Sequence, residues 1–124
     1  MKWKFPISPV AASRPRVSKW GAYFTGTYKD FRLAAKPVVE NTIGDWQPTE
    51  SQLYVYVGLY PTKPKTSKLL YPRPDIDNYV KSILDLCNGV VWNDDAQIIF
   101  LEAHKEWAKK DGYFTLEIKE MSDE

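Results

Sequence analysis

The chain has little of the chemistry that depends on sulfur or imidazole. Its 124 residues include one cysteine, Cys87, and one histidine, His104. A single cysteine excludes an internal disulfide and a zinc site built from cysteines, and its place on the apolar side of an expected helix predicts a buried thiol. No serine or cysteine pairs with His104 in a pattern typical of a hydrolase, so we expect this histidine to be structural or exposed.

Long apolar runs are also missing. No segment approaches the roughly 20 apolar residues that span a bilayer. An N-terminal signal peptide is not expected either, because Pro6 and Pro9 interrupt the apolar stretch that would follow Lys2 and Lys4. These absences predict a cytoplasmic protein with no membrane partner, and the length predicts one domain over residues 1–124.

Charge is unevenly distributed, although the formal net charge is only +1. Residues 1–73 hold twelve Lys or Arg against four acidic residues, a net charge of +8, whereas residues 74–124 hold five Lys against twelve acidic residues, a net charge of −7. Such a split favours a half that binds a polyanion beside an acidic half that needs cations. Because distant segments mix in a fold, an accident of sequence is the alternative.

Helical periodicity marks two segments. Residues 28–36 are expected to form a helix that ends before Pro37, since proline disfavours helical backbone in the residue before it. Residues 76–88 are expected to form a second helix that stops at Gly89. Its buried face is predicted from apolar residues at three- and four-residue spacing: Ile76, Val80, Ile83, Leu84 and Cys87.

Strand signals fall on both sides of these helices. Residues 51–60 are rich in β-branched and aromatic side chains on both faces, which predicts a central strand. Residues 2–7 read as a short first strand, and residues 90–92 as a brief extended run. An Asp-Gly turn between residues 97–107 and 113–119 predicts that these two strands form a hairpin.

Acidic residues gather around the second helix. Asp75 and Asp77 stand at its start, Lys81 follows one turn later, and Asp94 and Asp95 come after the helix has ended. Mg²⁺ prefers carboxylate oxygens, and two such ions about 4 Å apart can hold the attacking and leaving oxygens of a phosphodiester. A lysine beside them can stabilise the charge that develops in the reaction. The alternatives are that the two aspartates cap the helix and that the lysine forms a surface ion pair with Asp77 or Asp85.

A site of this kind makes a geometric demand. A helix of about 13 residues is roughly 20 Å long, so an acid that follows the helix must return to its N-terminal end. The return is met if residues 90–92 run back antiparallel beside the helix, or if a second subunit supplies the acid.

Basic residues are candidates for contacts with the phosphates of a polyanion such as DNA. They lie in a basic and aromatic loop at residues 8–22, on the helix 28–36, and in a proline-punctuated loop at residues 61–74. The candidates are Arg14, Arg16, Lys19, Lys29, Arg32, Lys63, Lys65, Lys68 and Arg73.

Two stretches of the sequence resemble a known family. The run Arg-Pro-Asp-Ile-Asp-Asn-Tyr-Val-Lys-Ser-Ile-Leu-Asp at residues 73–85 is followed by Gly-Val-Val-Trp-Asn-Asp-Asp-Ala-Gln-Ile at residues 89–98. Both acidic clusters and the intervening lysine are similar in type and spacing to the RusA family of Holliday junction resolvases, which are crossover-junction endodeoxyribonucleases often encoded by phages and prophages.

The resemblance implies a fold and an activity. The fold would be a small α+β homodimer with a mixed β-sheet and two main helices. The activity would be magnesium-dependent cleavage, with Mn²⁺ as a substitute, in which two symmetric nicks resolve a four-way DNA junction during recombination and repair. Asp75, Asp77 and Asp95 would be the catalytic, metal-binding acids and Lys81 the essential lysine. Asp94 would be a further possible ligand, and Lys105 a possible phosphate contact.

Two other readings remain open at this point. The chain is a non-catalytic DNA-binding module if its aspartates only cap a helix. It is a small metal-dependent nuclease without junction preference if it cuts plain duplex as fast as a junction.

Overall fold

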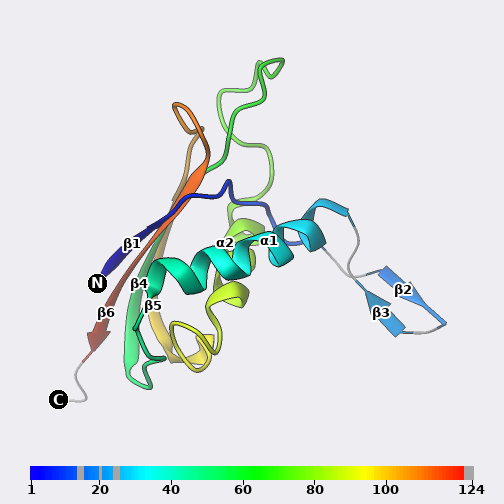
Figure 1. The fold of residues 1–124 in the computed structure, drawn as a ribbon. Coiled ribbons are helices and arrows are strands. Elements are labelled where there is room, and N and C mark those ends of the chain that lie inside the picture. The colour runs from blue at the N-terminus through cyan, green and yellow to red at the C-terminus, as the bar shows by residue number, and fades with distance from the viewer. Residues whose placement is uncertain (14–15, 20, 24–25, 122–124) are drawn as a thin grey trace.

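The computed structural model describes residues 1–13, 16–19, 21–23 and 26–121, and of residues 16–18 and 21–23 it describes the backbone alone. The elements follow the chain in the order shown in Figure 1. Their bounds are β1 Lys2–Phe5, β2 Arg16–Ser18, β3 Gly21–Tyr23, α1 Gly26–Ile43, β4 Gln52–Tyr60, α2 Ile76–Cys87, the short 3₁₀ helix η1 Asp95–Gln97, β5 Ile98–Lys105 and β6 Tyr113–Met121.

Four strands form one mixed sheet in the order β1-β6-β4-β5, and β2 pairs separately with β3. β4 runs parallel to β5 and antiparallel to β6, so the predicted central strand is confirmed. Alternate residues of β4 point into the core, where Leu53, Val55, Val57 and Leu59 are fully buried. With two helices, these strands confirm the expected α+β fold with a small mixed sheet.

The predicted hairpin between residues 97–107 and 113–119 is wrong. β6 pairs with β1 and β4, while β5 lies on the opposite edge of the sheet. After β5 the chain crosses the end of β4, where the Glu106 amide donates to the Leu59 carbonyl at 3.0 Å and the Ala108 amide to the Pro61 carbonyl at 2.9 Å. This crossing puts β6 between two strands, which buries its alternating Phe114, Leu116 and Ile118.

α1 is longer than predicted, because the helix continues through Pro37 to Ile43. Proline cannot donate to the carbonyl of the residue four positions before it. That residue is Leu33, which is 69% exposed, so water can take the place of the missing donor. Beyond the proline, Val39 and Ile43 extend the buried row of the helix, and this burial outweighs the local preference to stop.

α2 confirms the second predicted helix and ends one residue earlier than expected. Val80, Ile83 and Cys87 are buried as predicted, whereas Ile76 is 37% exposed and Leu84 only half-buried. Tyr79 and Ser82 are buried instead. The N-terminal segment contributes to this difference, because the Ala12 amide donates to the Asn78 carbonyl at 2.9 Å and covers that side of α2.

Both helices lie against one face of the sheet (Figure 1). They close a core that includes Trp3, Phe5, Phe31, Val39, Ile83, Val91 and Trp92 together with the inward rows of β4 and β6. α2 starts beyond the C-terminal ends of β4 and β5 and runs back toward their N-terminal ends, where Trp92 forms a bridge to Thr49. Across the described part of the chain, none of the helices has the length and apolar character needed to cross a membrane.

Candidate functional site

Two carboxylates stand at the N-terminal end of α2. Asp75 is the N-cap residue in an extended conformation, with φ −62° and ψ 141°, yet its side chain makes no capping hydrogen bond. Its backbone carbonyl accepts from the Asn78 amide at 3.1 Å and from the Tyr79 amide at 3.3 Å. The Asp77 Oδ1 accepts from the Asn78 amide at 2.9 Å. Both residues are exposed. Hydrogen bonds at the helix end therefore use one carboxylate oxygen of Asp77 and neither carboxylate oxygen of Asp75.

Lys81 faces the same solvent one turn further along α2. Its Nζ lies 3.5 Å from the Asp85 Oδ2, and its side chain is 66% exposed. An exposed pair at this spacing contributes only about 0.3–0.5 kcal/mol to stability. The structure therefore shows the expected surface ion pair, with Asp85 as the partner, and the pair is weak enough for Lys81 to leave it at little cost.

The later acidic pair divides into two environments. Asp94 caps η1, because its Oδ2 accepts from the Ala96 amide at 3.2 Å while its own amide donates to the Gln97 Oε1 at 2.9 Å. Asp95, the first residue of η1, takes no part in this capping box. Of the two, Asp95 is the carboxylate that the capping box does not engage, and its place as the third acid stays a prediction.

Gln97 fixes this short helix to the sheet. Its Nε2 donates to the carbonyls of Thr49 and Ser51, each at 2.9 Å, so η1 is held at the N-terminal end of β4. Sequence reasoning missed this residue, although an Asp followed three positions later by Gln is the spacing of a capping box.

The two acidic groups lie at opposite ends of the sheet. Asp75 and Asp77 stand beyond the C-terminal end of β5, where the Lys105 Nζ donates to the Pro74 carbonyl at 2.7 Å. Asp95 stands directly before the N-terminal end of β5. A helix with the 12 residues of α2 is about 18 Å long. No group of three or more His, Cys, Asp or Glu side chains is placed to hold a metal ion within the described residues of one chain.

Residues 90–92 do not run back antiparallel beside α2, which was one of the two routes for the return of an acid. The chain turns instead, with the Val91 amide donating to the Cys87 carbonyl at 2.9 Å and the Gly89 amide to the Trp92 carbonyl at 2.7 Å. Gly89 permits the turn through its φ of 77°. Trp92, fully buried, then ties the chain to the N-terminal side of β4. Of the two routes by which a third acid could join Asp75 and Asp77, only a second subunit remains.

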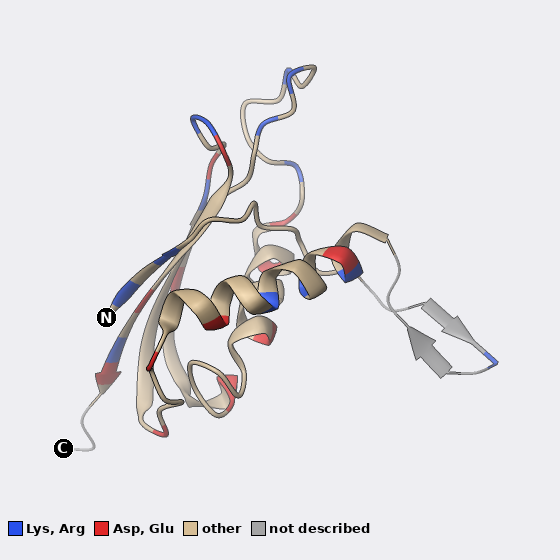
Figure 2. Ribbon diagram, in the orientation of Figure 1, with Lys and Arg blue, Asp and Glu red and all other residues tan. Residues whose placement is uncertain are grey.

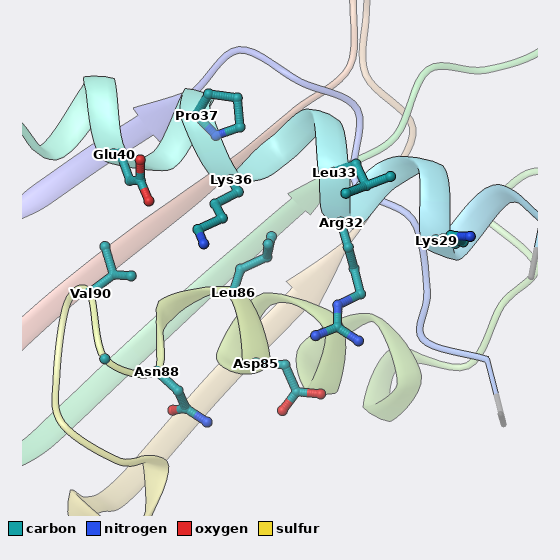
Figure 3. A pocket seen from close by; sticks show the side chains of 11 residues that line it. Lys29, Arg32, Leu33, Lys36, Pro37, Glu40, Asp85, Leu86, Asn88 and Val90 are labelled. Atoms are coloured by element: carbon teal, nitrogen blue, oxygen red, sulfur yellow. The ribbon is translucent and has the colours of Figure 1, made fainter. Parts of the chain in front are cut away.

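Basic residues mark two other regions, α1 and the loop after β4 (Figure 2). A groove of about 740 Å³ between α1 and the end of α2 is lined by Lys29, Arg32 and Lys36 on one side and by Asp85 and Asn88 on the other. Arg32 and Lys36 extend from α1 toward α2 in Figure 3. The loop candidates Lys63, Lys65, Lys68 and Arg73 are all exposed.

The N-terminal candidates are only partly visible. Arg14 lies outside the described residues, and Arg16 is described by its backbone in β2 alone. Lys19, in the turn between β2 and β3, is exposed.

β5 is an edge strand with an apolar surface. It pairs with β4 on one side only. Ile99, Phe100 and Leu101 are 55%, 52% and 44% exposed. An edge that presents unpaired backbone groups and consecutive large apolar side chains is typical of a surface that another chain covers.

The thiol and the imidazole occupy structural positions, as expected. Cys87 is fully buried, and burial raises the pKa of its thiol to about 12. The His104 Nδ1 lies 2.8 Å from the Tyr56 hydroxyl, and its Nε2 lies 3.6 Å from the Glu106 Oε2.

Comparison with known proteins adds two findings. The model of the protein family described as Endodeoxyribonuclease RusA matches residues 6–119. The "Uncharacterized protein YqaN" of Bacillus subtilis (strain 168) is 39% identical over 51 residues, which are 39% of this chain and 36% of that protein. The matched part of the chain thus spans about a third of the length of this relative.

Proposed function

Because the chain belongs to the RusA endodeoxyribonuclease family over residues 6–119, we propose that it is a magnesium-dependent nuclease that resolves four-way DNA junctions. Paired symmetric nicks on opposed strands would turn the junction into two duplexes during recombination and repair. Residues 1–124 would act as one endonuclease domain. The observation that carries the proposal is the pair of exposed carboxylates at the start of α2, which helix capping leaves largely unused.

The residues at this end of α2 fit a magnesium ion. Asp75 offers its whole carboxylate and Asp77 its second oxygen, which suits a hard cation that keeps several waters and takes one or two carboxylates. When bound, Mg²⁺ would supply a Lewis acid for the scissile phosphate and lower the pKa of an attacking water. Mn²⁺, which also prefers oxygen ligands, is the expected substitute.

A second copy of the chain would supply the third acid that one chain does not bring to Asp75 and Asp77. In an antiparallel strand pair, the start of one strand lies opposite the end of the other. If β5 pairs with its copy about a two-fold axis, the partner's η1 comes to the end of β5 where Asp75 and Asp77 stand. The exposed Ile99, Phe100 and Leu101 would be covered by the same pairing. Each of the two sites in this homodimer would then combine Asp75 and Asp77 of one subunit with Asp95 of the other.

Lys81 and the basic surface would act on the DNA. Lys81 lies one turn from Asp77, and the exposed pair that it makes with Asp85 is weak. We assign to it the scissile phosphate, whose charge increases in the transition state. The groove beside α1 and the loop after β4 carry Lys29, Arg32, Lys63, Lys65, Lys68 and Arg73, which would hold the arms of the junction through their phosphates. Arg14, Arg16 and Lys19 would extend this contact.

A synthetic four-way junction labelled on each strand tests the proposal. We expect nicks at symmetric positions on two opposed strands with Mg²⁺, and none with a chelator or on linear duplex of the same sequence. Asp77→Asn is expected to abolish the nicks while junction binding persists. The matched control is Asp111→Asn, an exposed acid in the loop before β6, which should cut like the wild type.

Two outcomes would contradict the proposal in different ways. Tight junction binding without nicks under any divalent metal would make the chain a DNA-binding module whose aspartates belong to the helix end. Equal cleavage of duplex and junction would keep the nuclease and remove the junction preference.

A further inference from the structure

The segment that leads into the acidic helix end has few means of holding its own shape. Residues 69–74 follow β4 as part of a connection without helix or strand, and Pro72 and Pro74 have no backbone N–H to donate. Leu70 is 91% exposed and Tyr71 60%, whereas Pro72 is fully buried. Residues 69–74 belong to no strand ladder and to no helix. Their carbonyls therefore depend on hydrogen-bond donors from other segments of the chain.

Those donors come from the end of β5 and the residues after it. The Lys105 Nζ donates to the carbonyls of Pro72 at 2.8 Å and Pro74 at 2.7 Å. The Trp107 Nε1 donates to the Leu69 carbonyl at 2.9 Å. Lys105 is half-buried, and its backbone pairs with Leu59 in the sheet, so its side chain extends from a strand and not from a loop. Its Nζ also lies 5.7 Å from the centre of the Tyr71 ring.

We infer that Lys105 is a positioning residue for the metal ligands rather than a contact for DNA. Its two bonds hold the carbonyl of the residue directly before Asp75 and that of Pro72, two residues earlier in the chain. This fixes where α2 begins and therefore where Asp75 and Asp77 present their carboxylates. Charge-assisted bonds of this length are stronger than neutral ones. The inference rests on the proposed metal site and assigns Lys105 a role that the site does not otherwise require.

The role differs from phosphate contact in what it predicts. An ammonium has three donors, and two of those of Lys105 are directed at carbonyls of its own chain. A lysine that contacted phosphate would raise DNA affinity at every junction and would release counterions on binding. A lysine that positions carboxylates would change the affinity for metal and leave the affinity for DNA as it is.

The experiment compares Lys105→Met, Lys105→Arg and the wild type as full chains. The first measurement needs no DNA and no activity: Mn²⁺ alone is added to isotope-labelled protein, and broadening of the amide signals of residues 75–78 is followed. We expect Lys105→Met to raise the Mn²⁺ concentration at half-broadening by about 10- to 100-fold, the usual loss when a group that orients a metal ligand is removed. Lys105→Arg, which keeps the charge and several donors, should recover most of the affinity. Lys110→Met, an exposed lysine of the β5–β6 connection, is the matched control and should change nothing.

The second measurement is junction affinity in a chelator as a function of salt. We expect Lys105→Met to leave the dissociation constant and the salt dependence unchanged. A slope of log K against log salt reduced by about 0.9, the value for one lost phosphate contact, would overturn the inference. An unchanged Mn²⁺ midpoint in Lys105→Met would also overturn it.

Two further comparisons separate causes. If Lys105→Met does not fold, Trp107→Phe replaces it, since this change removes one bond to the same segment and leaves a ring to pack. The Mn²⁺ midpoint should again rise, and no rise would contradict the inference. If the wild type shows no broadening at residues 75–78, the proposed metal site itself fails. If the wild type binds Mn²⁺ there but Lys105→Met binds it equally well, only the role of Lys105 fails.

Discussion

The arrangement of the acids predicts that an active site can be rebuilt from two inactive chains. Asp77 and Asp95 stand at opposite ends of β5, and α2 between them has 12 residues and is about 18 Å long, a gap that no side-chain rotation closes. The perturbation is a heterodimer in which one chain carries Asp77→Asn and the other Asp95→Asn. If each site joins Asp75 and Asp77 of one subunit to Asp95 of the other, this heterodimer has one intact site and one site with both lesions.

The expected magnitude follows from the two-fold symmetry. Because one of two equivalent sites is intact, the first nick should appear at about half the wild-type rate, and the second strand should stay uncut. Each homodimeric parent should be inactive. The two chains carry different tags, so that the heterodimer is purified by two successive affinity steps before the labelled junction and Mg²⁺ are added.

A matched control has both lesions in the same half of the site. A heterodimer of Asp75→Asn with Asp77→Asn has no intact site under any pairing and should be inactive. A heterodimer of Asp77→Asn with Asp95→Asn that is as inactive as its parents would refute the shared site. Wild-type protein that cuts junctions as a monomer would refute it as well.

Three other expectations concern the core and the sheet. Ser82→Ala should raise the free energy of unfolding by about 1 kcal/mol in urea titrations, because the buried Ser82 Oγ has no hydrogen-bond partner within the described residues, and a lower value would contradict this. Cys87 should resist thiol reagents at pH 8 until the protein is denatured, because burial raises its pKa to about 12 and the reactive thiolate is scarce; rapid labelling of the native protein would be the contrary result. Gly58→Ala should lower the melting temperature, because a Cβ there would meet the Thr115 Oγ1 and lie 2.9 Å from the Tyr60 Cε2, and the added Thr115→Ala should restore part of the loss.

Strong periodicity made parts of the fold predictable. β4 and α2 were predicted nearly to the residue, because each combines a clear hydrophobic period with a proline or glycine that ends it. α1 was predicted too short, since the preference of Pro37 to end a helix is local, whereas the burial of Val39 and Ile43 is tertiary. The hairpin failed for a similar reason: an Asp-Gly turn reports where the chain turns and not which strand it pairs with next.

The candidate site divides in the same way. Asp75, Asp77 and Lys81 are neighbours on one helix end, so their spacing in the sequence already predicts their proximity. The place of Asp95 depends on how the chain turns at Gly89 and on where Gln97 holds η1, and neither is encoded by local spacing. The role of Lys105 could not be predicted either, since its partners are carbonyls of proline residues 31 and 33 positions earlier in the chain.

The most direct test of the central claim, that the chain resolves four-way junctions, uses a supercoiled plasmid that extrudes such a junction from an inverted repeat. A single nick relaxes such a plasmid and lets the junction disappear, so linear product requires two opposed nicks within one encounter. With wild-type protein and Mg²⁺, the account predicts direct formation of linear plasmid, none with a chelator, and none from a plasmid without the repeat. Supercoiled plasmid left intact, or linear product formed equally fast without the repeat, would contradict it.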